Sequence, residues 1–286
     1  RREMPTGQVY IDGQVEQLSR SGQFVGQHIC TPKLGVSLHI NAFNFPVWGM
    51  LEKMAPALLA GMPVIVKPAT ATCQVTELAF NIIVAAGILP KGSVQLITGD
   101  LGDLLDYLGG QDVVSFTGSE TTGRHLRTHP ALIHNAVHFM AEQDSLNASV
   151  LGTDVAIDTA EFDLFIKEVH REIIVKAGQK CTAVRRVMVP EYLLDHVQAA
   201  LIDKLSQTTI GNPRHPKTRM GALVSLSQRQ DVLEKAAKIG AEAQCVFGRD
   251  GLSAVIDASA ETGAFVAPRL FRCENPDQAQ AVHDID

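Results

Sequence analysis

The most informative run of the sequence is Val64-Ile65-Val66-Lys67-Pro68. Its apolar residues are continuous rather than alternating, which is typical of a strand that is buried on both faces of a parallel sheet. The segment before it, 47–59, has a helical pattern that stops at Gly61. The segment after it, 72–86, has apolar residues at the spacing of one helix face and stops at Gly87. A strand flanked by helices of this length predicts a βαβ unit.

The same alternation extends through the rest of the chain and predicts an α/β fold on a parallel sheet, with right-handed crossovers. We expect further strands at 36–40, 94–97, 113–116, 187–189, 245–247 and 265–272, and further helices at 101–108, 162–176, 192–205 and 225–237. Continuity is weakest near Gly152-Thr153-Asp154. We therefore expect two domains, 1–152 and 153–286.

The composition excludes several classes of protein. The chain has 286 residues, of which 45% are hydrophobic and 20% are charged, and these values are ordinary for a globular protein. The longest uncharged apolar stretch, 54–66, is shorter than the roughly 20 residues that a membrane-spanning helix needs. The net charge of −6 argues against nucleic acid as a partner. We therefore expect a globular protein that binds neither membranes nor nucleic acid.

The cysteines and the chain ends add three expectations. The five cysteines are widely spaced and contain no CxxC pair, so they predict neither a disulfide framework nor a metal site. The chain starts with Arg-Arg-Glu-Met and not with a basic and then apolar leader, so we expect a cytoplasmic protein. It stops at 283–286 without a helix terminator or a polar tail, and we expect it to be a segment of something longer.

Cys181 is the candidate nucleophile. It lies in the glycine-containing loop 176–182, directly after a long expected helix. Lys180, Arg185 and Arg186 are its cationic neighbours in the sequence, and cations favour thiolate, the nucleophilic form. The alternative is a buried structural thiol, because free cysteine is among the most buried residue types. The local sequence alone favours that alternative, and it does so more strongly for the other four cysteines.

Two further polar residues follow expected strands. Glu142 comes directly after Phe139-Met140-Ala141 and is a candidate general base, the alternative being a solvated loop acid. Asn44 lies in the loop after the strand expected at 36–40. Its amide is a candidate donor to an oxyanion, the alternative being a cap of the following turn. The position of Asn44 fits a binding site, because ligands of open α/β sheets bind outside the carboxyl ends of the strands.

Two segments are candidates for binding phosphate or ribose. Lys67-Pro68 ends the buried strand, where a cation can meet a phosphate or a ribose hydroxyl. Thr117-Gly118-Ser119 ends the next strand but one and opens a helix, whose backbone N–H groups can hold a phosphate. The alternative for Ser119 is helix capping. Neither segment matches GxGxxG or the P-loop.

Together these residues resemble the aldehyde dehydrogenase family, whose motifs appear here in the family's order. The motifs are Asn44-Phe45-Pro46, Val66-Lys67-Pro68, Ala86-Gly87 with Pro90, Ile97-Thr98-Gly99, Phe116-Thr117-Gly118-Ser119, Glu142 and Gly178-Gln179-Lys180-Cys181-Thr182. The resemblance implies the fold of that family, with a Rossmann-like cofactor domain and an α/β catalytic domain. It also reverses the interpretation of Cys181 as a structural thiol.

A narrower resemblance is to the branch of the family that oxidises CoA-linked semialdehydes in aromatic degradation, which includes the dehydrogenase half of the bifunctional phenylacetate-pathway ring-opening protein. It is carried by residues 39–50, Lys67-Pro68-Ala69-Thr70, Glu142-Gln143-Asp144-Ser145-Leu146-Asn147 and Glu168-Val169-His170-Arg171-Glu172. It implies a small-molecule, CoA-linked aldehyde as the substrate and a homo-oligomer. A hydratase domain fused beyond residue 286 would point to the phenylacetate pathway, and its absence to the benzoate route.

The resemblance implies a role for each motif residue. Cys181 is the catalytic nucleophile, Asn44 and the backbone N–H of Cys181 stabilise the oxyanion, and Glu142 activates the water that hydrolyses the thioester. The residues that it assigns to cofactor binding are Ile40, Lys67, Ala69, Thr70, Gly99, Thr117, Gly118, Ser119 and Asp286.

The sequence departs from the common family pattern in three places. Gln143-Asp144-Ser145 stands where most members have Leu-Gly-Gly, which reshapes the loop after the expected base. Thr70 stands where NAD-preferring members often have Glu, and without that carboxylate NADP is favoured, with NAD as the alternative. The chain stops at Asp286, where the family continues, so part of each domain is expected to be missing.

We therefore expect an enzyme that oxidises an aldehyde to a carboxylate with NAD(P)+, through a cysteine thiohemiacetal and a thioester. One alternative is an acyl-CoA-forming dehydrogenase of the same fold, against which Glu142 argues because such enzymes generally lack the deacylating Glu. Another is a non-catalytic scaffold, which the joint presence of Asn44, Glu142 and Cys181 disfavours for the parent protein.

Overall fold

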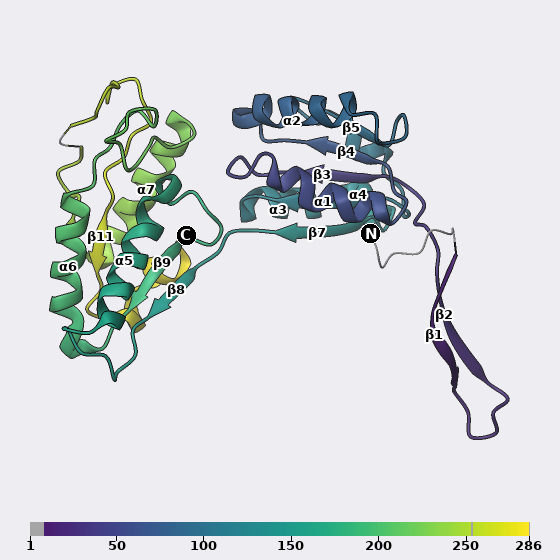
Figure 1. Cartoon of the computed structure of the whole chain (residues 1–286), viewed down its shortest axis with the longest axis horizontal. Helices are drawn as coiled ribbons and strands as arrows, with labels where there is room; N and C mark the ends of the chain where they lie inside the picture. The colour runs from purple at the N-terminus through teal and green to yellow at the C-terminus, as the bar shows by residue number, and fades with distance from the viewer. Residues whose placement is uncertain (1–8, 253, 286) are drawn as a thin grey trace. The chain divides into compact units, whose positions relative to one another are not determined.

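The computed structural model describes residues 9–252 and 254–285. The chain divides into two compact units, Arg1–Gln143 and Asp144–Asp286. The division comes earlier than the boundary expected at 152–153, because strand β8 (Asn147–Val150) pairs with β9 (Val184–Met188) of the second unit. The first unit is built around a parallel sheet and the second around its helices (Figure 1).

The first unit contains a five-stranded sheet in the order β5-β4-β3-β6-β7. All four strand pairs are parallel, so every strand ends at the same edge of the sheet. The four strands predicted between 36 and 116 are confirmed, with ends shifted by at most one residue. These four are β3 (Ser37–Ile40), β4 (Val64–Lys67), β5 (Val94–Leu96) and β6 (Val113–Thr117), and the fifth strand of the sheet is β7 (His138–Glu142).

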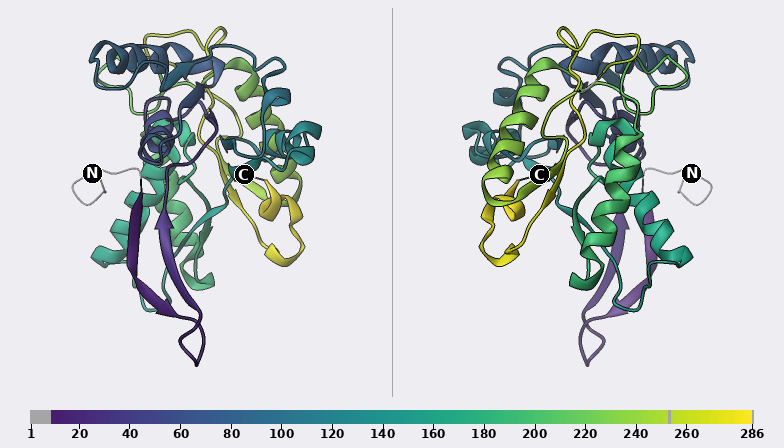
Figure 2. Two further views of the ribbon diagram at one scale, coloured as in Figure 1. Left: turned by 90° about the vertical axis from the view of Figure 1, so that its right-hand side faces the viewer. Right: turned by 90° about the vertical axis from the view of Figure 1, so that its left-hand side faces the viewer.

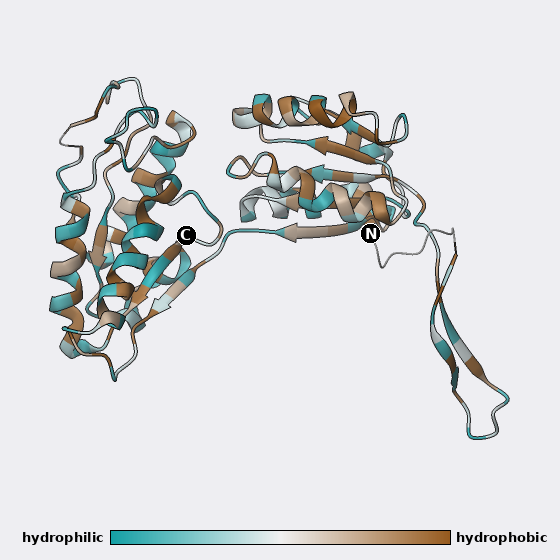
Figure 3. Cartoon of the chain, viewed as in Figure 1, coloured by the Kyte–Doolittle hydropathy of each residue, from teal (hydrophilic) through white to brown (hydrophobic). Residues whose placement is uncertain are grey.

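One face of the sheet is covered by α1 (Trp48–Leu59) and α2 (Cys73–Ala85). Val64 and Val66 are fully buried on this face, where they pack against Met50 and Met54 of α1 and against apolar residues of α2. Figure 3 shows β4 and much of α2 in the hydrophobic colour; the residues of β4 are packed here, whereas Leu78 and Ile82 of α2 are exposed. Each of the two helices is followed by a glycine with positive φ, as predicted for Gly61 and Gly87.

The opposite face carries a second apolar cluster. Leu38, Ile40, Val114 and Phe116 point to this side and are buried. They pack against the short elements η2 (Leu104–Tyr107), α3 (Glu120–Arg127) and α4 (Pro130–His134). Apolar residues on both faces explain why the strands read as continuous apolar runs, and they make the sheet a doubly wound one.

The helix expected at 101–108 is wrong, since only the 3₁₀ turn η2 forms there. Gly102 has φ +56, a left-handed conformation, and its backbone N–H is bonded to Asp100. A residue in that conformation cannot begin a right-handed helix.

A hairpin precedes the sheet and was not predicted from the sequence. Strands β1 (Tyr10–Gln17) and β2 (Val25–Cys30) pair antiparallel, with an irregular register between Asp12 and Glu16. All of β1 and nearly all of β2 is exposed, so its side chains show no alternation between buried and exposed positions. Figure 2 shows the two strands as a twisted ribbon. Without a buried face, the period-2 pattern that indicates a strand is absent.

In its described residues the second unit packs four α-helices with two strand pairs, β8–β9 and β10–β11. Its main core joins Leu151, residues of α5 and α6, and partly buried residues of β9. The strand expected at 187–189 begins earlier, at Val184, and the one expected at 265–272 shortens to its last three residues. The remaining elements are α5 (Ala160–Ile174), α6 (Leu194–Ser206), α7 (Leu226–Glu242), α8 (Gln280–Asp284), β10 (Gln244–Phe247), β11 (Leu270–Arg272), η1 (Thr70–Thr72), η3 (Val175–Gly178), η4 (Glu191–Leu193) and η5 (Pro276–Gln278).

No helix within the described ranges is both long enough and apolar enough to cross a membrane.

A polar row runs along β3 on the face that α1 covers. The imidazole Nε2 of His39 lies 2.8 Å from the hydroxyl of Ser37, and both residues are buried. Burial, together with the nearby charge of Lys53 on α1, lowers the pKa of His39 from its ordinary value of 6.5 to about 4. The sheet therefore encloses a histidine that is neutral at physiological pH.

Acid should destabilise the first unit through His39. The unfolded chain takes up a proton near pH 6.5 and the folded chain only near pH 4, so stability is lost as the pH falls through this window. Between pH 7 and pH 5 the free energy of unfolding should drop by about 2 kcal/mol through this residue. Urea titrations at both pH values should show a smaller drop in His39→Gln than in wild type.

A matched control is His138→Gln, which changes an exposed histidine on β7. Its stability should follow the wild-type pH profile. Equal pH profiles for His39→Gln and wild type would show that His39 does not cause the acid sensitivity.

Candidate active site

The carboxyl edge of the five-stranded sheet gathers most of the polar residues singled out in the sequence. Strands β4 and β5 extend the sheet on one side of β3, and the chain then crosses to the other side to form β6 and β7. This reversal next to β3 is a topological switch point, where open α/β sheets bind their ligands. The residues that lie at or just beyond this edge are Ile40, Asn44, Lys67, Ala69, Thr70, Gly99, Thr117, Gly118, Ser119 and Glu142.

The loop after β3 carries Asn44, which is half-buried. Two threonines at the start of the next crossover hold this loop. The hydroxyl of Thr72 donates to the carbonyl of Phe43 at 3.1 Å, and that of the fully buried Thr76 donates to the carbonyl of Pro46, also at 3.1 Å. Asn44 is therefore placed on a loop that is bonded on both sides of it.

The chain after β4 passes directly into the 3₁₀ turn η1. Lys67 is the last residue of β4, and its carbonyl accepts the backbone N–H of Asn41. Ala69 is extended and leads into Thr70, the first and exposed residue of η1. No carboxylate follows the strand in this segment, which leaves Lys67 as its charged group.

The turn after β5 is open, whereas the turn after β6 is tight. The hydroxyl of Thr117 is buried and has no hydrogen-bond partner within the described part of the chain. A Cβ added at Gly118 would lie 2.6 Å from the Phe116 ring, whereas one at Gly99 would meet nothing within 4 Å. A buried hydroxyl without a partner fits a ligand that brings its own polar atoms, such as a nucleotide.

Ser119 also performs the structural role that was considered for it. Its side chain caps α3 by accepting the backbone N–H of Thr122 at 3.4 Å. The hydroxyl of Ser119 therefore serves as the cap of this helix.

Glu142 is the last residue of β7, and its side chain is exposed. It lies opposite Thr117 in the register, and its carbonyl accepts the backbone N–H of Gly118 at 3.1 Å. The next residue, Gln143, packs over Gly123 of α3, where an added Cβ would lie 2.1 Å from its amide nitrogen. Glu142 is thus fixed by the strand on one side and by the packing of Gln143 on the other.

Cys181 belongs to the second unit and is exposed. The loop before it has an unusual backbone, because three successive residues are left-handed. Lys176 has φ 54, Ala177 has φ 52 and Gly178 has φ 73. The left-handed conformation costs an L-residue about 1–2 kcal/mol, so the first two of these residues are strained. Such strain persists only where surrounding contacts impose it, and it concentrates at functional sites.

Polar contacts from several elements hold this loop. Lys180 reaches both carboxylate oxygens of Glu172 on α5, at 2.8 and 2.7 Å. Gln179 bonds the backbone at Lys176 and Val224 through its amide nitrogen and oxygen respectively. These contacts attach the loop to the helix before it and to the segment before α7.

The cations next to Cys181 are engaged in structural contacts. Lys180 is neutralised by Glu172, and Arg185 donates to the carbonyl of Gly178 at 3.0 Å. Arg186 donates to the carbonyl of Ile285 at 2.6 Å. Lys180 thus forms an ion pair with Glu172, a contact that its place next to Cys181 in the sequence did not indicate. The sequence shows the order of charged residues along the chain but not which of them meet in the fold, and Glu172 lies eight residues from Lys180.

The carbonyl of Cys181 has two side-chain donors that the sequence did not reveal. The hydroxyl of Ser145 donates to it, and so does the amide of Asn147, at 2.5 Å. Ser145 belongs to the stretch Gln143-Asp144-Ser145, in which the sequence departs from the common family pattern, whereas Asn147 lies beyond it. For Ser145 that departure was the available signal, but it did not indicate which residue the side chain contacts.

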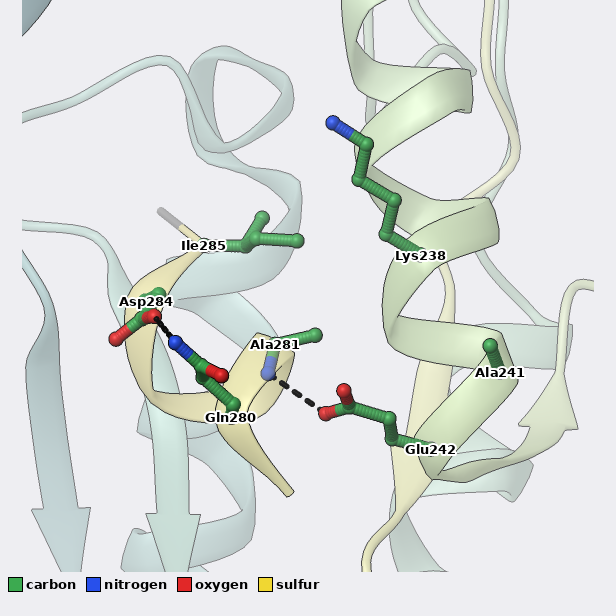
Figure 4. A pocket seen from close by; sticks show the side chains of 7 residues that line it. All are labelled: Lys238, Ala241, Glu242, Gln280, Ala281, Asp284 and Ile285. Atoms are coloured by element: carbon green, nitrogen blue, oxygen red, sulfur yellow. Dashed lines mark hydrogen bonds between the residues drawn. The ribbon is translucent and has the colours of Figure 1, made fainter.

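Other features of the described residues carry no site chemistry. A hollow of about 410 Å³ between α7 and α8 is lined by Lys238, Glu242, Gln280, Asp284 and three apolar residues (Figure 4). In it, Glu242 accepts the backbone N–H of Ala281, and the amide of Gln280 donates to Asp284. Within the described ranges there is no group of three or more side chains that could hold a metal ion. Asp286, expected to contact the cofactor, lies outside the described residues.

Comparison with known proteins gives this arrangement a context. A model of the aldehyde dehydrogenase family matches residues 9–285. The chain is 45% identical to a 3,4-dehydroadipyl-CoA semialdehyde dehydrogenase of Aromatoleum evansii, over 94% of this chain and 52% of that protein. The chain thus spans about half the length of the curated relatives it matches.

Two solved structures share the fold. A betaine aldehyde dehydrogenase of Staphylococcus aureus, solved with NAD+, has 27% sequence identity and a TM-score of 0.75, over 87% of this chain and 48% of that one. A succinic semialdehyde dehydrogenase of Streptococcus pyogenes, solved with NADP+, has 22% identity and a TM-score of 0.74, over 90% of this chain and 54% of that one. The match of the family model to nearly the whole chain, on the fold that the sheet order describes, shows that this chain belongs to the aldehyde dehydrogenase family.

Proposed function

We propose that this chain carries the reacting residues of an enzyme that oxidises an aldehyde to a carboxylate with a nicotinamide nucleotide. The observation that carries the proposal is an exposed thiol, Cys181, on a strained loop that surrounding side chains hold in place. An exposed thiol on a fixed loop is suited to attack a carbonyl carbon, because a nucleophile needs both access and a fixed direction.

In the proposed reaction the thiolate of Cys181 attacks the aldehyde carbon and forms a tetrahedral thiohemiacetal. The amide of Asn44 and the backbone N–H of Cys181 donate to the oxyanion, and the loss of one such donor typically costs about 10²–10³ in rate. Loss of hydride from this adduct leaves a thioester on Cys181. Glu142 then removes a proton from the water that hydrolyses the thioester, which releases the carboxylate and restores the thiol.

The cofactor would be held by the first unit. A bound nicotinamide nucleotide supplies the hydride acceptor. The turns at Gly99 and Gly118 and the hydroxyl of Thr117 offer backbone and side-chain groups to its phosphates and ribose. Thr70 leaves the segment after β4 without a carboxylate, and Lys67 supplies a positive charge there. This charge pattern favours NADP, because a 2′-phosphate is attracted by the cation and repelled by no anion of this segment.

For the substrate we propose a semialdehyde linked to CoA through a thioester. The support is the similarity to the 3,4-dehydroadipyl-CoA semialdehyde dehydrogenase, which extends over 94% of this chain. Glu142, which is exposed at the end of β7, supports hydrolysis of the thioester over its transfer to free CoA. Product analysis of the intact protein with and without added CoA separates the two outcomes: a free carboxylate in both cases supports hydrolysis, and a new acyl-CoA thioester contradicts it.

Cys181→Ala in the intact protein should abolish nucleotide reduction with a CoA-linked semialdehyde, because no covalent intermediate can form. The absorbance of the reduced nucleotide measures this directly. Cys30→Ala removes another exposed thiol, on the hairpin, and should keep wild-type activity. Full activity in Cys181→Ala would contradict the proposed function.

Glu142→Gln should keep the first turnover and block later ones, because the thioester forms but water is no longer activated. Rapid mixing should then show a burst of reduced nucleotide equal to the enzyme concentration, with steady turnover lowered about 10²-fold or more. Glu77→Gln, a neutralised exposed acid on α2, is the matched control. Unchanged steady turnover in Glu142→Gln would assign deacylation to another group.

Thr70→Glu should shift the preference from NADP toward NAD. The new carboxylate repels a 2′-phosphate and can accept hydrogen bonds from ribose hydroxyls, so KM for NADP should rise about tenfold or more. The ratio of kcat/KM values for the two nucleotides measures the shift. Gln74→Glu adds the same charge at an exposed position of α2 and should leave the ratio unchanged. An unchanged ratio in Thr70→Glu would show that residue 70 does not discriminate between the 2′-phosphate of NADP and the 2′-hydroxyl of NAD.

A further inference from the structure

The residues that follow Glu142 in the sequence contact the backbone of Cys181. We propose that Ser145 and Asn147 are positioning residues that fix the backbone of Cys181, and through it the direction of the thiol. This inference rests on the proposed role of Cys181 as the nucleophile. The hydrogen bonds described for these two side chains go to backbone carbonyls and to each other, so the role assigned to them acts through the backbone of Cys181.

The contacts saturate the carbonyl of Cys181. A carbonyl oxygen has two lone pairs, and here the hydroxyl of Ser145 and the amide of Asn147 each donate to it. The amide of Asn147 also lies 3.2 Å from the hydroxyl of Ser145, so the two donors are themselves in contact. The peptide plane after Cys181 is thereby held from one side by two linked side chains.

Asn147 extends the contact beyond Cys181. The same amide nitrogen lies 3.3 Å from the carbonyl of Ala183, and the backbone N–H of Ala183 donates to the carbonyl of Lys180 at 3.2 Å. Ala183 is 1% exposed, so this end of the loop is anchored in the protein interior. One side chain therefore bridges two carbonyls that lie two residues apart and sets the path of the chain between them.

The direction of the thiol depends mainly on the backbone of its loop. Cys181 is exposed, so little side-chain packing fixes its χ1 rotamer or its direction. The loop before it contains the strained residues Lys176 and Ala177 and would relax if its contacts were removed. Glu172 and Gln179 hold the loop on the side before Cys181, while Ser145 and Asn147 hold it on the side after.

A purely structural role for Asn147 is the competing explanation. Asn147 is the first residue of β8 and lies opposite Val184 of β9, where the register of the pair is irregular. If its amide served only to close this end of the strand pair, its removal would lower stability without altering the reactivity of the thiol. Measurements of stability and of thiol reactivity on the same variants separate the two roles.

The test uses Ser145→Ala, Asn147→Ala and Ser145→Thr in the intact protein. Ser145→Thr keeps the hydroxyl and serves as the rescue. Ser206→Ala and Asn212→Ala are matched controls, because each removes a polar contact of the second unit outside this loop: Ser206 donates to the carbonyl of Asp203, and Asn212 donates to Asp257. The first readout is the rate of alkylation of Cys181 by iodoacetamide from pH 6 to 10, followed on its peptide by mass spectrometry without substrate or nucleotide.

We expect Ser145→Ala and Asn147→Ala each to slow alkylation by about three- to tenfold, the effect of one hydrogen bond. The burst of nucleotide reduction should slow by about tenfold to 100-fold, since misplacement of a reacting group is costly, while KM for the nucleotide stays unchanged. Ser145→Thr and both controls should stay within about twofold of wild type in both measurements.

Wild-type alkylation rates in both alanine variants, at every pH, would overturn the positioning role, whatever their thermal stability. A loss of stability alone, with reactivity kept, would have the same meaning. If alkylation slows as expected but the wild-type protein oxidises no aldehyde, the positioning role stands and the proposed function fails. The two proposals are therefore distinguishable.

Discussion

The parallel pairing of β3 with β4 on one side and β6 on the other is the constraint on which the first unit depends. It places Ile40 opposite both Lys67 and Phe116, so three strands end at one level of the sheet. Parallel strands must be linked by crossovers, and here these cover both faces and bury Leu38 and Val66 on opposite sides. The loops that follow the strands therefore all emerge at the carboxyl edge, and the proposed nucleotide site follows from that.

The second unit positions Cys181 by a different physical means. No strand end presents the thiol; a left-handed loop does, and charge pairs and amide contacts keep that loop from relaxing. Lys180 illustrates the difference. It lies next to Cys181 in the sequence, yet its ammonium group is bound to Glu172 and serves the shape of the loop. The described contacts of Lys180 fix the shape of the loop that carries this thiol.

The sequence was sufficient for those parts of the fold that depend on burial. A strand that is buried on both faces needs apolar residues at every position, and Val64-Ile65-Val66 has them. Strand β4 and its neighbours were therefore predictable. The hairpin β1–β2 was not predicted, because β1 is exposed throughout and has no buried face. Strand β8 does alternate between partly buried and exposed positions, but its partly buried residues are the polar Asn147 and Ser149 while Val150 is exposed, so its apolar residues do not mark the packed face. The turn η2 was mistaken for a helix because the apolar spacing at 101–108 gave no weight to the backbone of Gly102.

The candidate site was predictable to a different extent in its two halves. Lys67, Thr117 and Glu142 end predicted strands, and a parallel sheet collects such residues by itself. The residues around Cys181 could not be found this way. Ser145 and Asn147 reach it from 36 and 34 positions earlier in the sequence, and their contacts are with a carbonyl, a group that every residue has. Nothing in the identity of either residue specifies such a partner.

The left-handed pair Lys176 and Ala177 sets a limit on how the protein can be improved. Glycine accepts a positive φ without steric cost, so Ala177→Gly would relieve strain in the folded state, yet glycine would also give the loop more freedom. Thermal robustness and a single loop conformation are therefore opposed at this position, whereas in most helices and strands they go together. An engineer selecting only for melting temperature would drift toward glycine here and would exchange a defined loop for a mobile one.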